Sequence, residues 1–193
     1  MSGGTATAVV GGIVCALLIV VAAALVATYN RLVRLRNQTD ASWAQIDVQL
    51  KRRYELIPNL VETVKGYAAH ERGTLDAVVA ARGTAMTAAQ APGPAGRADA
   101  EGALTAALGR LFALAEAYPD LKANQSFVAL QVELATTEDK IAYARQFFNS
   151  AIQSYNNAVQ TLPTNLIAGL TGFRSRDFFQ AGGDERGPVA VRF

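Results

Sequence analysis

The chain has 193 residues, with 18 basic and 16 acidic side chains, one histidine and one cysteine. A net charge of +2 is too small to indicate nucleic-acid binding, and a single cysteine excludes an internal disulfide. Without its apolar N-terminal segment the chain keeps about 160 residues, enough for one domain with its own core.

An apolar run extends from Ala8 to Ala27, and the first thirty residues carry no charged side chain. Twenty residues of helix rise about 30 Å, the thickness of a bilayer's hydrocarbon core, so the run predicts one transmembrane helix. A cleaved signal peptide is the alternative, but it usually has a basic start and an apolar core of about 7–15 residues. Cys15 follows bulky Ile13 and Val14 in the middle of the run, which disfavours a lipoprotein processing site.

Basic residues flank the predicted span on one side. None precedes it, whereas Arg31, Arg34 and Arg36 follow it, where we expect them to lie at the membrane surface. Short flanks rich in Lys and Arg tend to stay in the cytoplasm. The pattern therefore predicts a single-pass cell-membrane protein with its N-terminus outside and its main domain in the cytoplasm. The predicted domains are an anchor over residues 1–28, a helical bundle over 29–173 and a mobile C-terminal tail over 174–193.

A helical stripe follows the anchor over residues 29–90. Apolar and aromatic side chains recur there at steps of three, four and seven, as on one face of an α-helix. The stripe comprises Trp43, Ile46, Leu50, Ile57, Leu60, Val64 and Tyr67. One helix of about 60 residues would be on the order of 90 Å long, so it must project from the membrane or bend. Pro58 is the expected kink rather than an end, because the stripe keeps its phase across it.

Two further helices are predicted, separated by short breaks. Residues 91–96 contain two prolines and two glycines and predict a loop. A helix over residues 97–118 ends at a Tyr-Pro-Asp turn, and another spans residues 124–161, with Asn124 or Ser126 as its N-cap. Residues 166–170 predict a short helical turn. The compatible stripes predict an all-α fold in which the transmembrane helix continues into an elongated antiparallel bundle of long helices.

The sequence offers little for catalysis. His70 is the one histidine, and Tyr67 stands three residues before it, where a di-iron carboxylate motif requires glutamate. A zinc site or a Ser-His-Asp arrangement would also depend on His70, and no nucleophile-elbow or phosphate-loop pattern accompanies it. We therefore predict no catalytic, cofactor-binding or metal-binding residues and expect the protein not to be an enzyme.

Residues 51–67 form the densest polar pattern. On a helix, Arg52, Glu55, Asn59 and Glu62 lie away from the apolar stripe, and the last three share one face at steps of four and three. One interpretation is an ordinary solvated face whose bases pair with acids. The other is a polar strip that docks a second subunit or another protein, which makes these four residues a candidate docking face.

The stretch from residue 162 to residue 179 is amphipathic. Its large apolar side chains are Leu166, Ile167, Leu170, Phe173, Phe178 and Phe179. One interpretation places them in the membrane interface, and the other has them cap the open end of the bundle near Pro163.

Several motifs, in matching order and spacing over residues 29–179, resemble the LemA family of bacterial membrane proteins. They are Tyr29-Asn30, Trp43, Gln45-Ile46-Asp47, Arg53 to Val61, Val64 to Tyr67, Ala117 to Asn124, Phe147-Phe148-Asn149, Tyr155-Asn156 and Pro163 to Leu170. The resemblance implies a single-pass membrane protein with a long-helix bundle, and it supplies no catalytic residues. It also implies that relatives associate with membrane metalloproteases and, in magnetosome-forming bacteria, with the shaping of organelle membranes.

Together these observations predict a membrane-anchored helical scaffold or adaptor without a cofactor. Its expected partners are the lipid bilayer, further copies of itself, and a membrane metalloprotease or another membrane protein. The alternative is a membrane-shaping protein that acts through oligomerisation and its amphipathic C-terminal segment.

Overall fold

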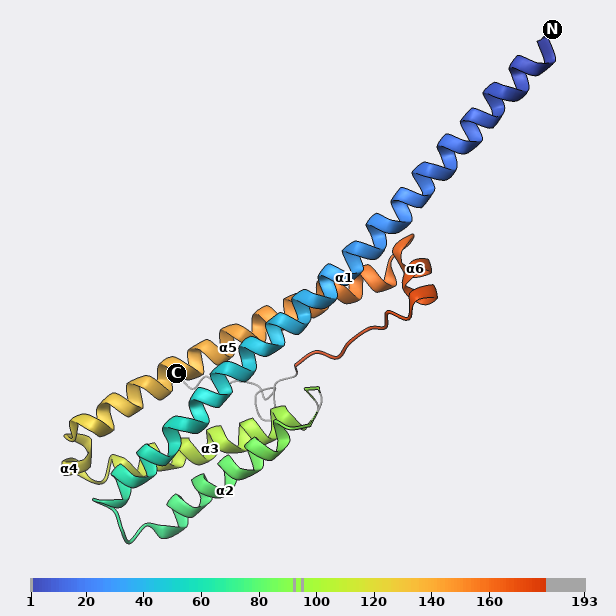
Figure 1. Ribbon diagram of the computed structural model, residues 1–193. Helices are drawn as coiled ribbons and strands as arrows, with labels where there is room; N and C mark the ends of the chain where they lie inside the picture. The colour runs from blue at the N-terminus through green and yellow to red at the C-terminus, as the bar shows by residue number, and fades with distance from the viewer. Residues whose placement is uncertain (1, 92, 95, 180–193) are drawn as a thin grey trace, which may run out of the picture. The chain divides into compact units, whose positions relative to one another are not determined.

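The computed structural model describes residues 2–91, 93–94 and 96–179, and side chains from residue 7 onward. Within these ranges the chain is helical and has no strand (Figure 1). The helices are α1 (Ser2–Lys65), α2 (Arg72–Ala88), α3 (Arg97–Ala115), α4 (Pro119–Lys122), α5 (Gln125–Gln160) and α6 (Thr164–Thr171). The chain forms two compact units. Among the described residues, we name 2–41 with 150–176 the anchor unit, and 42–149 with 177–179 the bundle unit.

The apolar run forms the first part of α1 in the anchor unit. It is long and apolar enough to cross a membrane, and none of its most apolar stretch is buried against the rest of the protein. Leu18 and Val20, for example, are each 65% exposed. A continuous apolar helix surface is the feature that a bilayer can cover.

A small core joins α1, α5 and α6 in the anchor unit. Leu32, Ala158 and Ala168 are buried together, and Ile167 and Phe173 pack against them. The helix α6 ends at Gly172, whose φ of 79° is readily adopted by glycine and whose N–H donates to the Ala168 carbonyl. The predicted short helix before Gly172 is therefore confirmed.

The bundle unit contains residues 42–65 of α1, α2, α3, α4 and the first part of α5. Figure 1 shows α2 and α3 side by side. The three sequence stripes supply the core, which confirms the predicted all-α bundle. Its fully buried side chains include Ile46, Leu50, Ile57, Leu60, Val64, Leu104, Leu111 and Ile141.

The prediction of one helix over residues 29–90 is wrong, because α1 ends at Lys65 and α2 begins at Arg72. Glycine at position 66 weakens the helix, and the chain turns so that Ala68 becomes buried. The turn is held to later segments, since Asn124 donates from Nδ2 to the Tyr67 hydroxyl at 2.9 Å. A glycine directly after a last turn that contains a lysine is a typical signal of a helix C-terminus. The prediction of a longer helix gave more weight to the apolar stripe, which continues past Gly66.

Pro58 lies inside α1 and does not end it, as expected from the phase of the stripe. Proline has no N–H to donate to the carbonyl four residues earlier, which belongs to Tyr54. Arg82 of α2 supplies the missing hydrogen bond, because its Nε donates to the Tyr54 carbonyl oxygen at 2.8 Å. The proline thus creates a backbone acceptor through which α2 is held to α1.

Asn124 caps α5. The Phe127 N–H donates to the Asn124 side-chain oxygen at 3.0 Å, which decides between the two N-cap candidates, since Ser126 lies within the helix.

The first part of the predicted tail has defined contacts. In the anchor unit, Asn156 of α5 bonds both backbone groups of Arg176, with each distance 2.9 Å. In the bundle unit, the Asn149 side chain bonds both backbone groups of Phe179, and each distance is again 2.9 Å. Residues 174–179 are therefore bound rather than free, and the rest of the predicted tail lies outside the described residues.

Candidate functional site

The four residues of the predicted docking face, Arg52, Glu55, Asn59 and Glu62, are all exposed on one side of α1 in the bundle unit. Arg52 forms an ion pair with Glu133 of α5. Glu55 lies 3.9 Å from Lys51, and Glu62 lies 3.6 Å from Lys65. The structure therefore brings the four together, and local ion pairs partly neutralise their charges.

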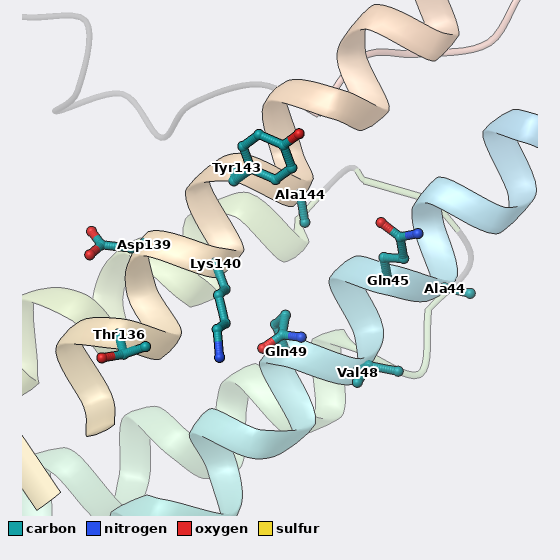
Figure 2. Close-up of a pocket in the computed structure, with 9 residues that line it drawn as sticks. All are labelled: Ala44, Gln45, Val48, Gln49, Thr136, Asp139, Lys140, Tyr143 and Ala144. Carbon is teal, nitrogen blue, oxygen red and sulfur yellow. The ribbon is translucent and has the colours of Figure 1, made fainter. Parts of the chain in front are cut away.

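An open groove extends this face toward the start of the bundle unit. It lies between α1 and α5, has a volume of about 550 Å³, and is shown in Figure 2. Its lining residues are Ala44, Gln45, Val48, Gln49, Thr136, Asp139, Lys140, Tyr143 and Ala144. Ala44 and Val48 precede Arg52 at steps of four, so the groove and the polar strip occupy one continuous face of α1. We call this combined surface the outer face.

The groove combines exposed apolar walls with a few polar groups. Val48 is 63% exposed and Tyr143 is 71% exposed, so both present apolar area to solvent along the groove. Figure 2 shows Lys140 and Gln49 extending into the space between the helices. Asp139 adds an acid beside Lys140, so the groove offers charges of both signs along with apolar area.

A buried polar network ties three helices of the bundle unit together. Arg53 of α1 lies 3.3 Å from Glu101 of α3 and 3.2 Å from Glu138 of α5, in both cases from Nη1. Its Nη2 also donates to the Thr105 hydroxyl at 2.7 Å. The Arg53 and Glu101 side chains are 2% and 0% exposed, and Tyr54 donates its hydroxyl to Glu101. Such a network fixes how α1, α3 and α5 pack.

Sequence reasoning missed Arg53 because it follows Lys51 and Arg52, and a basic run usually marks a solvated face. A signal was present. Arg53 comes three residues after Leu50 and four residues before Ile57, which places it on the same helical face as these two buried residues. Its side chain is therefore expected to enter the core.

A second ionic contact lies near the start of α3. Arg97 Nη2 is 2.6 Å from Asp47, and the Arg97 guanidinium carbon lies 5.0 Å from the centre of the Trp43 ring. Trp43 in turn packs against Phe148, with ring centres 5.1 Å apart. This cation–π contact holds the N-terminal end of α3 against α1.

The network keeps the Tyr54 phenol neutral. Burial raises its pKa above the ordinary value of 10.0, and the hydrogen bond to Glu101 raises it further. As pH rises past about 10, the unfolded chain therefore releases this proton while the folded chain keeps it. The stabilising contribution of Tyr54 is fully present below that pH and is lost above it.

We expect the thermal stability of the full chain to fall between about pH 10 and 11, by up to about 1.4 kcal/mol per pH unit from this one group. Circular dichroism melts of the detergent-solubilised chain across this pH range measure the decrease in stability. The Tyr54→Phe variant should lose the contribution of Tyr54 to the slope of stability against pH, whereas Tyr143→Phe, at an exposed tyrosine, should keep that slope. Equal slopes in the two variants would contradict the assignment.

The remaining sequence candidates are not part of the outer face. His70 is exposed in the turn between α1 and α2, and Arg31, Arg34 and Arg36 are exposed on α1 in the anchor unit. Within the described ranges, no three His, Cys, Asp or Glu side chains come together in a way that can hold a metal ion. The described groups of the bundle unit thus offer ion pairing and apolar contact.

The family model that matches this chain is that of the LemA family, over residues 42–193. The chain belongs to the LemA family. Magnetosome protein MamQ 2 of Paramagnetospirillum magneticum is 29% identical over 182 residues, covering 82% of this chain and 66% of that protein. Protein LemA of Metamycoplasma hominis is 26% identical over 158 residues, covering 81% of this chain and 71% of that protein.

The chain therefore spans slightly less than two thirds of the length of the MamQ relative. A second MamQ, from Magnetospirillum gryphiswaldense, is 29% identical over 178 residues and is covered to 65%. The names of these relatives denote no enzymatic reaction. The family membership confirms the resemblance inferred from the motifs, and it supports a membrane-associated helical protein.

Proposed function

We propose that this protein is a membrane-anchored scaffold that self-associates through its outer face. The apolar run supplies the membrane attachment, and the outer face supplies the docking surface. By the excess of arginine after the run, the bundle unit lies in the cytoplasm. A membrane metalloprotease or another membrane protein is the alternative occupant of the same face.

The groove between α1 and α5 is the observation that carries the proposal. Protein interfaces combine an exposed apolar centre, often with tyrosine, and a polar rim. Here Val48 and Tyr143 form the centre, and the strip from Arg52 to Glu62 forms part of the rim. A two-fold dimer presents the same patch on both copies, so the patch must complement itself. Asp139 beside Lys140 meets that condition, because each copy offers an acid to the other's base.

Charge in the groove should disrupt this self-association. We expect Tyr143→Asp to shift the gently extracted full chain from oligomer to monomer in native mass spectrometry, because it places charge where apolar area is covered. Ala106→Asp, at an exposed alanine of α3, is the matched control and should leave the oligomer unchanged. A wild-type monomer, or an oligomer that survives Tyr143→Asp, would contradict self-association through this face. A stoichiometric heteromer lost in the variant would instead point to the alternative occupant.

The proposed orientation has its own test. Alkaline phosphatase fused to the C-terminus should be inactive in cells, because the enzyme works only outside the cytoplasm. Robust activity of the fusion would contradict a cytoplasmic bundle unit.

Membrane shaping is a second candidate function. It is favoured by exposed leucines on α6 and by relatives that are named as magnetosome proteins. If purified protein leaves the shape of anionic liposomes unchanged in electron micrographs, this candidate fails while the scaffold proposal stands.

A further inference from the structure

A ridge of three exposed leucines runs along α6 and the turn before it. Leu162, Leu166 and Leu170 recur every four residues, and their exposed fractions are 74%, 63% and 88%. On the other side of α6, Ala168 is buried and Ile167 packs against the anchor-unit core. The amphipathic stretch is thus divided, with some of its apolar residues closing a core and these three facing outward.

We propose that this leucine ridge is a membrane-contact surface that inserts into the headgroup and acyl boundary of an anionic bilayer. An exposed apolar ridge needs a cover, and an amphipathic helix lying in the interface plane is covered by lipid. The proposal concerns the anchor unit alone, so it goes beyond self-association of the outer face and does not depend on it.

The position of α6 along α1 is the first argument. Ala168 of α6 packs against Leu32, and Phe173 lies with its ring centre 5.8 Å from that of Tyr29. These α1 residues come directly after the apolar run, which ends at Ala27. When the run spans a bilayer, the next turns of α1 lie at the headgroup level. The contacts with α1 therefore hold α6 at the membrane surface.

The charge of the anchor unit is the second argument. It contains five arginines and one aspartate, a net charge of +4, whereas the whole chain carries only +2. Arg176 pairs with that aspartate, Asp40, at 2.5 Å, which leaves the exposed Arg31, Arg34, Arg36 and Arg174 in excess. Basic residues beside a span attract the negative surface of anionic lipid. The groove of a second copy carries charges of both signs, so it complements the excess positive charge of the anchor unit less well than anionic lipid does.

Spin-label accessibility in vesicles tests the proposal on the full chain. In a Cys15→Ala background, single cysteines at Leu166 and Leu170 would be labelled and reconstituted in vesicles of phosphatidylcholine with phosphatidylglycerol. Val132, which is 60% exposed on α5 of the bundle unit, is the matched control position. Collision rates with oxygen, which partitions into lipid, and with a water-soluble nickel chelate report where each label lies.

We expect the two α6 labels to collide several-fold more with oxygen than with nickel, and the Val132 label to show the reverse. Replacing phosphatidylglycerol by phosphatidylcholine, or Arg31, Arg34 and Arg36 by Gln, should reduce that ratio at position 166. Labels that collide freely with nickel would place the ridge in water and overturn the proposal. Labels shielded from both reagents would place it against protein and overturn it as well. Neither result would bear on the groove.

Discussion

Replacing Arg53 by alanine should lower the free energy of unfolding by about 3–5 kcal/mol. The substitution leaves the Glu101 carboxylate, which is fully buried, without its cationic partner. It also removes the ion pair with Glu138 and the hydrogen bond to Thr105, so α1, α3 and α5 lose the polar contacts that Arg53 makes between them. Chemical denaturation of the full chain in detergent, followed by circular dichroism, measures the loss.

Arg52→Ala is the matched control, because it removes the neighbouring arginine and its ion pair to Glu133. That pair is partly exposed to solvent, with side chains 49% and 36% exposed, so its loss should cost no more than about 1 kcal/mol. The triple variant Arg53→Leu, Tyr54→Phe, Glu101→Leu should regain most of the stability, because it removes the buried arginine and glutamate together and leaves neither charge unpaired in the core. Equal losses for Arg53→Ala and Arg52→Ala would show that the network does not stabilise the bundle.

The second large effect is expected at the bound C-terminal segment. Phe179→Ala should destabilise the bundle unit by about 3–5 kcal/mol, the usual cost of truncating a buried phenylalanine. The Phe179 ring is 4% exposed and lies 6.0 Å from that of Trp43, with the Arg145 guanidinium carbon 4.6 Å from its centre. Unfolding of the full chain in detergent is again the measurement.

Phe178→Ala provides the control within the same segment. Its side chain is 42% exposed, and truncation of a surface residue usually changes stability by about 0.5 kcal/mol or less. If both phenylalanines proved equally dispensable, the segment would not be a structural part of the bundle unit.

The helical architecture could be predicted because it depends on periodicity. The stripes containing Ile46, Leu104 and Ile141 were apparent from spacing alone, and these residues are buried. The end of α1 was missed because Tyr67 extended the apolar spacing beyond Gly66, although Tyr67 is exposed and bonds Asn124. Apolar spacing alone could not show where the chain reverses.

The candidate site was only partly predictable, since a groove depends on which helices meet. The strip from Arg52 to Glu62 follows from one helix, whereas the groove needs α5 to bring Tyr143 to the same groove as Val48. The bound segment needs Asn149 and Asn156, whose side chains pair with backbone groups and so leave no pattern in the residues they hold. Such pairings become visible only in three dimensions.

Photo-crosslinking in intact membranes tests most directly whether the outer face docks a second copy. A benzophenone amino acid at position 143 preserves the aromatic character of the tyrosine and reacts with whatever covers the groove. We expect a crosslinked dimer of this chain from position 143 and none from the control position Ala106. Absence of a dimer at position 143, or equal yields from the two positions, would contradict docking of a second copy on the outer face.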